Sequence, residues 1–166
     1  MAEWELRNAR LRQMAPALYA ALKRAHVDAP YWQWPDALRK HEDAALAAFA
    51  RHHGDAIELE IFLQYLLSRD LDALKAYATE RGVGLMGDAP IFVAHDSADV
   101  WAHPELFLID ANGDLTEVAG VPPDAFSDEG QLWGNPLYDW SKIAETGYRF
   151  WIARLGKAFE TFDAVR

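Results

Sequence analysis

The stretch Gly-Val-Gly-Leu-Met-Gly-Asp, residues 82–88, decides the fold class. It is a short apolar run that ends in Asp88 and follows an amphipathic segment with helical spacing. A run of this length after a helix and a glycine predicts a buried parallel strand. A helix, a glycine, an apolar strand and an acidic residue at the strand's carboxyl end form one unit of an α/β barrel, where catalytic groups gather. We therefore predict an α/β fold that is part of a (β/α)8, or TIM, barrel.

The chain before this stretch is predicted to be helical. Apolar residues recur at helical spacing over residues 8–26, where Pro16 should kink or restart the helix. After a break at residues 31–34, Pro35 suits the first turn of a helix that runs to about residue 51.

The clearest helix covers about residues 57–80, and Gly82 should close it in a left-handed conformation. Residues 1–81 are therefore interpreted as a helical segment that precedes the barrel and packs on it. One apolar stripe marks the clearest helix: Leu59, Phe62, Leu63, Leu66, Leu67, Leu71, Leu74 and Ala78.

Residues 94–140 are too long and irregular for a plain connection between a strand and a helix. Within them Asn112-Gly113 separates two apolar runs, residues 107–110 and 115–118, which is the strongest short signal for a β-hairpin. A loop rich in Gly and Pro follows over residues 119–138. Long ordered loops inside a compact domain are usually functional, so we interpret this segment as a functional insertion.

The end of the chain is predicted to return to the barrel pattern. Asp139 or Ser141 can cap a last helix over about residues 142–162, and residues 163–166 have the pattern of an opening strand. Residues 82–166 are thus interpreted as part of a barrel that holds a strand, the insertion, a helix and the start of the next strand. Because the sequence ends inside an element, we expect an internal fragment of a longer protein.

The composition argues against several classes of function. The chain has 166 residues, of which 51% are hydrophobic, a formal net charge of −10 and no cysteine. The acidic balance argues against nucleic acid or an anionic membrane as a partner, and the lack of cysteine excludes disulfides and thiolate chemistry. The first residues lack a basic region followed by an apolar run, so we expect no signal peptide. No apolar run reaches the roughly 18 residues that a membrane span needs, and we expect a cytoplasmic protein.

Two segments carry candidate binding residues. Asp88, at a strand's carboxyl end, could accept hydrogen bonds from sugar hydroxyls or could cap the next turn. The stretch 120–138 is stiffened by two prolines and presents an acid, amides and aromatic faces, which suit a hydroxyl-rich, ring-shaped ligand. The alternative is a structural loop whose aromatic side chains fold onto the core. The candidate residues of this stretch are Asp124, Phe126, Gln131, Trp133 and Asn135.

No metal site is expected. His95, Asp99 and His103 recur at intervals of four residues, but the span is too short for the stable helix that one ligand face needs. The acidic turn at residues 110–114 resembles the start of a calcium loop, but it lacks the Glu that such a loop needs at its twelfth position. Ordinary turn chemistry explains it better.

These motifs together resemble the amylomaltases, or disproportionating enzymes, which are 4-α-glucanotransferases of the α-amylase clan. The resemblance is carried by residues 87–101, 118–124 and 130–138, and it is strong from residue 82 onward. It is weaker over residues 31–80 and poor before residue 30.

The resemblance implies roles for individual residues. Asp88 would hold hydroxyls of the sugar at the cleavage point. Arg166 would belong to an Arg-x-Asp signature that positions and ionises the nucleophile. Ala125 stands where some members place Tyr, which puts one aromatic contact in doubt. The residues expected on a loop that covers the active site and grips donor and acceptor glucan are Asp124, Phe126, Gln131, Trp133 and Asn135.

The resemblance also implies a retaining mechanism with no metal and no organic cofactor. One carboxylate attacks the anomeric carbon, a second carboxyl protonates the leaving oxygen, and another sugar takes up the glycosyl group. Both carboxyl groups would lie beyond Arg166, so the 166 residues alone are expected to be inactive, and maltooligosaccharides or other α-1,4-glucans are the expected substrates. Two alternatives remain: a non-catalytic α-glucan-binding module, and a hydrolase of the same clan.

Overall fold

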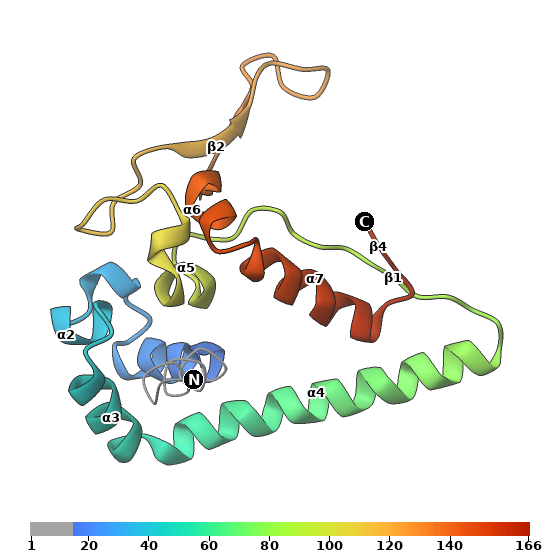
Figure 1. The fold of residues 1–166 in the computed structure, drawn as a ribbon, viewed down its shortest axis with the longest axis horizontal. Helices are drawn as coiled ribbons and strands as arrows, with labels where there is room; N and C mark the ends of the chain where they lie inside the picture. Colours follow the sequence, from blue (N-terminus) through green and yellow to red (C-terminus); the bar gives the residue numbers. More distant parts are fainter. Residues whose placement is uncertain (1–14) are drawn as a thin grey trace. The chain divides into compact units, whose positions relative to one another are not determined.

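The computed structural model describes residues 15–166, which form a mixed α/β chain as predicted (Figure 1). Residues 15–25 are helical, and the predicted start of this helix at residue 8 lies outside the described residues. The further elements are, in chain order, η1 (Tyr31–Gln33), α2 (Asp36–Arg39), α3 (Asp43–His52), α4 (Gly54–Glu80), β1 (Met86–Gly87), α5 (Ala98–Ala102), η2 (Pro104–Leu106), β2 (Val118–Val121), β3 (Gln131–Pro136), α6 (Trp140–Glu145), α7 (Arg149–Thr161) and β4 (Ala164–Val165).

The chain divides into two compact units, and α4 contributes to both. The first unit consists of the described part of Met1–Ile61 together with Phe92–Tyr138. The second unit consists of Phe62–Ile91 and Asp139–Arg166. The predicted division after residue 81 separates barrel segments from the helices before them, and it stays a prediction.

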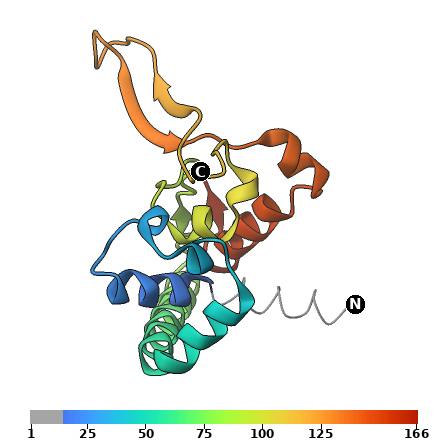
Figure 2. The ribbon, with the colours of Figure 1, turned by 90° about the vertical axis from the view of Figure 1, so that its left-hand side faces the viewer.

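The first unit is built around three aromatic rings. Tyr19, Trp34 and Trp101 lie with ring centroids between 5.4 and 5.9 Å apart, and all three side chains are buried. The predicted break before Pro35 is the 3-10 turn η1, which places Tyr31 and Trp34 in this core. Figure 2 shows the helical residues 15–25 with α2, α3 and α5, and the hairpin of β2 and β3 extending beyond them.

The predicted helix from Pro35 to residue 51 is wrong as a single element. Pro35 does precede a helix, but α2 ends at Arg39 and α3 begins at Asp43. Between them His41 adopts a left-handed conformation with φ of 59°, which a continuous right-handed helix cannot contain.

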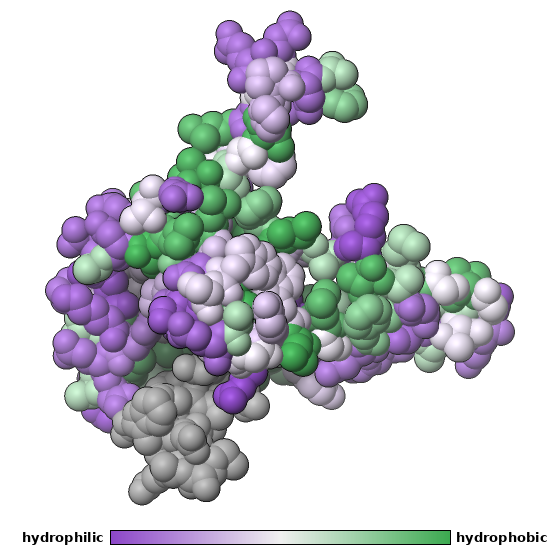
Figure 3. Space-filling view, turned by 45° about the horizontal axis from the view of Figure 1, so that its top comes forward, coloured by the Kyte–Doolittle hydropathy of each residue, from purple (hydrophilic) through white to green (hydrophobic). Residues whose placement is uncertain are grey.

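Helix α4 confirms the clearest sequence prediction, although it begins three residues earlier, at Gly54. Its end has the expected geometry: Gly82 has φ of 68°, the Val83 N–H donates to the Ala78 carbonyl and the Gly82 N–H to the Thr79 carbonyl. The apolar stripe, however, is largely exposed, with Phe62 at 54% and Leu67 at 61%. Figure 3 shows apolar areas on the exposed surface of the chain, between hydrophilic ones.

The predicted strand at residues 82–88 is a parallel strand, but it is short and only partly buried. β1 pairs with β4 in parallel, with Met86 opposite Ala164 and Gly87 opposite Val165. Met86 is 72% exposed, so the expectation of a buried strand is wrong at this residue. Gly87 is buried against Phe162, whose ring carbon would lie 2.2 Å from a Cβ added at this position.

The insertion at residues 94–140 contains more β-structure than predicted. The turn at residues 110–114 is closed by an Ile109–Leu115 bridge, which confirms the first hairpin. Residues 119–138 are not a plain loop, because β2 pairs antiparallel with β3. Gly120 allows the close approach of the two strands, since a Cβ there would lie 2.6 Å from the Gln131 carbonyl oxygen.

The predicted last helix is divided in two. Asp139 caps α6 as expected, because its side chain accepts hydrogen bonds from the N–H groups of Ser141 and Lys142. The helix then stops at Glu145, because Gly147 and Tyr148 both have positive φ, and α7 begins at Arg149.

Candidate functional site

Asp88 and Arg166 form an ion pair in the second unit. Asp88 follows β1 and Arg166 follows β4, so the parallel register brings them to the same carboxyl edge. The Arg166 N–H donates to the Gly87 carbonyl, and the Ala89 N–H donates to the Arg166 carbonyl, both at 3.0 Å. The guanidinium then donates two hydrogen bonds to the carboxylate, from Nε to Oδ1 at 3.2 Å and from Nη2 to Oδ2 at 2.9 Å.

This two-point contact favours the charged form of both groups. The hydrogen bonds from Arg166, and then its positive charge, hold the pKa of Asp88 below the usual value of an aspartate. The same hydrogen bonds and charge raise the pKa of Arg166. Both side chains are exposed, so the pair presents an ionised carboxylate that can still accept hydrogen bonds.

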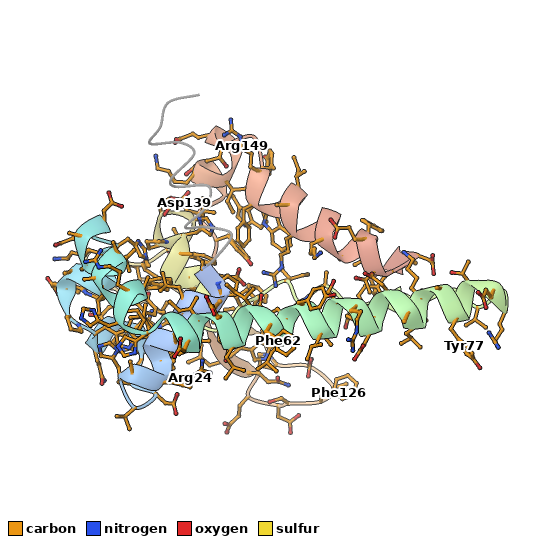
Figure 4. All side chains as sticks on the ribbon, turned by 90° about the horizontal axis from the view of Figure 1, so that it is seen from below. Arg24, Phe62, Tyr77, Phe126, Asp139 and Arg149 are labelled. Atoms are coloured by element: carbon orange, nitrogen blue, oxygen red, sulfur yellow. The ribbon has the colours of Figure 1, made fainter. Side chains whose placement is uncertain are left out.

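Asp124 organises the tip of the β2–β3 hairpin in the first unit. Its Oδ1 accepts hydrogen bonds from the N–H groups of Phe126 and Ser127, at 2.8 and 3.0 Å. These bonds make a compact turn that leaves the Phe126 side chain 93% exposed, and Figure 4 shows Phe126 in this loop. The local role of Asp124 is therefore a turn, whereas Phe126 presents an apolar ring to solvent.

Gln131 and Trp133 stand on the same face of β3, because alternate residues of a strand project to the same side. The Trp133 indole N–H donates to Gln131 Oε1 at 2.9 Å, and the Trp133 side chain is 47% exposed. The indole is thus held by its nitrogen, which makes its ring face the surface available to a ligand.

Asn135 is aimed differently because the strand is irregular. The register of β2 and β3 shifts between Val118 and Gly120, and Gly134, within β3, has φ of 74°. Such bulges re-aim the side chains that follow them. The Asn135 amide nitrogen donates to the Val93 carbonyl at 2.8 Å, in a partly buried position.

The sequence interpretation gave no individual role to Phe92 or Asp96, although both lie in residues 87–101, which carry the resemblance. Phe92 packs against Trp133 with ring centroids 5.9 Å apart and an interplanar angle of 67°. Nearby, Asp96 accepts hydrogen bonds from the Tyr19 hydroxyl and the Lys23 ammonium, both at 2.6 Å. No short motif carries these contacts, because Asp96 and its partners lie far apart in the sequence.

The remaining polar residues of the insertion have structural contacts. His95 stacks on Trp32 with ring centroids 4.1 Å apart, and its Nε2 lies 2.8 Å from the Gly113 carbonyl oxygen. Asp110 binds the N–H groups of Asn112 and Asp114, as expected for a turn. Across residues 15–166 there is no group of three or more His, Cys, Asp and Glu side chains that could hold a metal ion. Within the same range, no helix combines the length and the apolar character that crossing a membrane requires.

The predicted site residues thus fall into two groups. Asp88 and Arg166 contact each other in the second unit. Three of the hairpin candidates lie in β3, and the other two, Asp124 and Phe126, lie in the turn before it, all in the first unit. The five hairpin candidates are Asp124, Phe126, Gln131, Trp133 and Asn135.

Comparisons with known proteins agree with these motifs. A family model described as 4-alpha-glucanotransferase matches residues 6–166. A 4-alpha-glucanotransferase of Thermus thermophilus is 51% identical over 150 residues, which are 90% of this chain and 30% of the relative. A 4-alpha-glucanotransferase of Synechocystis is 45% identical over 155 residues, with the same coverage.

The fold has a solved counterpart. The structure of an amylomaltase from Streptococcus agalactiae, in complex with acarbose, matches with a TM-score of 0.88 and 34% identity, over 97% of this chain and 32% of that one. This chain spans about 30% of the length of the curated relatives it matches. Since the family model covers nearly all of the sequence, the chain belongs to the 4-alpha-glucanotransferase family.

Proposed function

We propose that the protein of which this chain is a part transfers α-1,4-glucan segments between maltooligosaccharides. The observation that carries this proposal is the β3 face with Gln131 and Trp133, an amide beside a half-exposed indole ring. Aromatic faces stack on the apolar faces of sugar rings, and an amide can exchange hydrogen bonds with their hydroxyls. Family membership and the acarbose complex of the similar amylomaltase support the same substrate class.

In this proposal Asp88 binds hydroxyls of the sugar at the cleavage point. Its carboxylate is ionised and lies at the carboxyl edge of the β1–β4 pair, which is where active sites of (β/α)8 barrels lie. We propose that β1 and β4 are neighbouring strands of such a barrel. Arg166 favours the ionised form of Asp88, and the resemblance suggests that it also positions a nucleophile.

The chemistry would be a retaining double displacement. A carboxylate forms a bond to the anomeric carbon while an acid protonates the departing glycosidic oxygen, and the hydroxyl of a second glucan then displaces the carboxylate. Residues of each unit would bind glucan by themselves: in the second unit Asp88 would bind hydroxyls of the sugar at the cleavage point. In the first unit Phe126, Gln131 and Trp133 would contact sugar rings. The proposed reaction uses no metal and no organic cofactor.

The proposed glucan transfer does not require a particular cellular compartment. We keep a cytoplasmic location as a prediction, although a relative from Oryza sativa is named as chloroplastic/amyloplastic. The acidic net charge of −10 suits a neutral sugar and disfavours nucleic acid as a partner.

The test is disproportionation of maltotriose. One sample contains the 166-residue chain, and the other contains a chimera in which residues 6–166 replace the matching part of the Thermus thermophilus relative. We expect glucose and longer oligosaccharides from the chimera and no products from the chain alone. A chimera that folds, yet makes no longer oligosaccharide, contradicts the proposal.

Product analysis separates the alternatives. Transfer leaves the total number of reducing ends constant, whereas hydrolysis raises it, so a steady rise would indicate a hydrolase. A non-catalytic glucan-binding module would show binding of maltoheptaose by the 166-residue chain without any product from the chimera.

A further inference from the structure

Phe92 contacts the proposed sugar-binding ring without belonging to the predicted site. Its ring meets that of Trp133 at 67°, an edge-to-face arrangement with centroids 5.9 Å apart. Aromatic pairs of this geometry are favourable because the positive edge of one ring meets the negative face of the other. Phe92 is half-buried, and Trp133 remains 47% exposed beside it.

Two contacts therefore define the plane of the Trp133 indole. The indole N–H of Trp133 is held by Gln131 Oε1 at 2.9 Å. This hydrogen bond alone leaves the indole ring free to rotate about its N–H end. Phe92 contacts the ring itself and opposes that rotation. A sugar that stacks on an indole needs the ring plane to be set before it binds, because ordering a side chain on binding costs affinity.

Phe92 can act in this way because its own backbone is anchored. The next residue, Val93, is buried, and its carbonyl accepts the Asn135 amide hydrogen bond at 2.8 Å. Three residues further on, Asp96 is tied to Tyr19 and Lys23 by hydrogen bonds of 2.6 Å. The segment from Phe92 to Asp96 thus connects the hairpin to the aromatic core of the first unit.

We propose that Phe92 is a positioning residue that sets the angle of the Trp133 ring for stacking on a glucose unit of an α-1,4-glucan. Phe92 acts through Trp133 and touches no substrate. This inference rests on the proposed function, since it takes a glucan as the ligand of the β3 face.

The test uses the chimera with the Thermus thermophilus relative and maltotriose as substrate. Phe92→Leu keeps an apolar side chain but removes the ring, so we expect KM to rise about five-fold with kcat within about two-fold. Phe92→Tyr keeps the ring and should restore the original KM. The matched control is Leu132→Ala, because Leu132 is 80% exposed on the opposite face of the same strand, and it should leave KM unchanged.

A double mutant shows whether Phe92 acts through Trp133. In a Trp133→Ala background, Phe92→Leu should change KM no further, because the ring that it positions is absent. Equal effects of Phe92→Leu with and without Trp133, or no rise in KM at all, overturn the inference.

A second readout keeps this test separate from the proposed function. In the 166-residue chain labelled with 5-fluorotryptophan, the ¹⁹F resonance of Trp133 is identified by its loss in Trp133→Phe. Phe92→Leu should shift or broaden this resonance, and Leu132→Ala should not. If the unmutated chimera is inactive, the proposed function fails, and an unchanged Trp133 resonance in Phe92→Leu would still overturn the positioning role.

Discussion

The two units bury very different shares of their apolar side chains. In the first unit Leu22 and Val100 are fully buried around the rings of Tyr19, Trp34 and Trp101. Among the described residues, Ala78 and Ile143 are the only members of the buried apolar core that lie in the second unit. Apolar side chains at helical spacing can therefore be buried in one unit and exposed in the other.

The difference shows what helical periodicity can and cannot predict. The stripe of α4 follows the helical period, yet Phe62, Leu67 and Leu74 are about half exposed or more. The period predicts that one face is apolar, because it is a local property of the helix. Burial depends on which other elements pack against that face, and the helical period carries no information about them.

The largest expected effect comes from the core of the first unit. Leu22→Ala should lower the free energy of unfolding by about 2–5 kcal/mol, because it leaves a cavity among side chains that cannot fully collapse. Leu67→Ala, on the exposed part of α4, should change it by less than about 0.5 kcal/mol. Urea unfolding followed by near-ultraviolet circular dichroism measures both. Equal losses of unfolding free energy in Leu22→Ala and Leu67→Ala would contradict the difference in burial between the two units.

A smaller effect is expected at the tightest contact of the second unit. Gly87→Ala places a Cβ 2.2 Å from a carbon of the Phe162 ring, so the ring or β1 must move, at a cost of roughly 1–3 kcal/mol. Gly84→Ala is the matched control, since its nearest neighbour, Asp163 Oδ2, would lie 3.8 Å away. Thermal unfolding should show a lower Tm for Gly87→Ala, and the further change Phe162→Ala should relieve the overlap. A Tm as low in Gly84→Ala would show that strand flexibility matters more than the ring.

The ion pair of Asp96 should contribute about 1–3 kcal/mol, because Asp96→Asn leaves a mostly buried Lys23 ammonium without its countercharge. Burial raises the pKa of Asp96, but the hydrogen bonds from Lys23, Tyr19 and the Tyr31 N–H outweigh it, and the net pKa lies below the usual value. The stabilisation is therefore present above the unfolded pKa of about 3.9 and is lost as the pH falls through the folded pKa.

The measurement is urea unfolding of Asp96→Asn and the unmutated chain between about pH 7 and pH 3. The difference between them should shrink toward acid. Asp36→Asn is the control, since Asp36 pairs with Lys40 and Arg39 on the surface, where solvent screening leaves such pairs little effect on stability. A difference for Asp96→Asn that is independent of pH would exclude the charge as its cause.

Local rules account for what the sequence predicted well. Gly82 and Asp139 end and begin helices through bonds to backbone groups within a few residues, and the sequence shows such residues directly. The helix breaks at His41 and Tyr148 were missed because helical spacing continues through both, and neither residue type usually takes a left-handed conformation.

Contacts between distant residues account for most of the rest. Asp96 joins Tyr19, Lys23 and Tyr31, which are 77, 73 and 65 residues away in the sequence, so no window of sequence contains the cluster. The β2–β3 hairpin was taken for a loop because its glycines and prolines are typical of turns. Gly120 is instead required by the close strands, a need that only the paired structure reveals.

The smallest expected effect is a pH dependence of stability that arises from His41 and should be limited to the first unit. Burial penalises the charged form of His41 and lowers its pKa, and the structure gives its buried Nε2 no hydrogen-bond partner. The folded chain therefore binds fewer protons at this ring than the unfolded chain does. Its contribution to stability is complete above the unfolded pKa of about 6.5 and declines as the pH falls below that value.

The second unit contains no histidine, so this loss should be confined to the first unit. Hydrogen exchange at about pH 7.5 and pH 5.5, corrected for the intrinsic exchange rate, should show less protection at low pH in residues 15–25 and α5 and no such change in α7. His41→Gln should remove the dependence, whereas His52→Gln should keep it, because His52 is exposed at the end of α3. If α7 loses protection together with the first unit, the two units unfold together. The difference in how many apolar side chains they bury would then not make their stabilities differ.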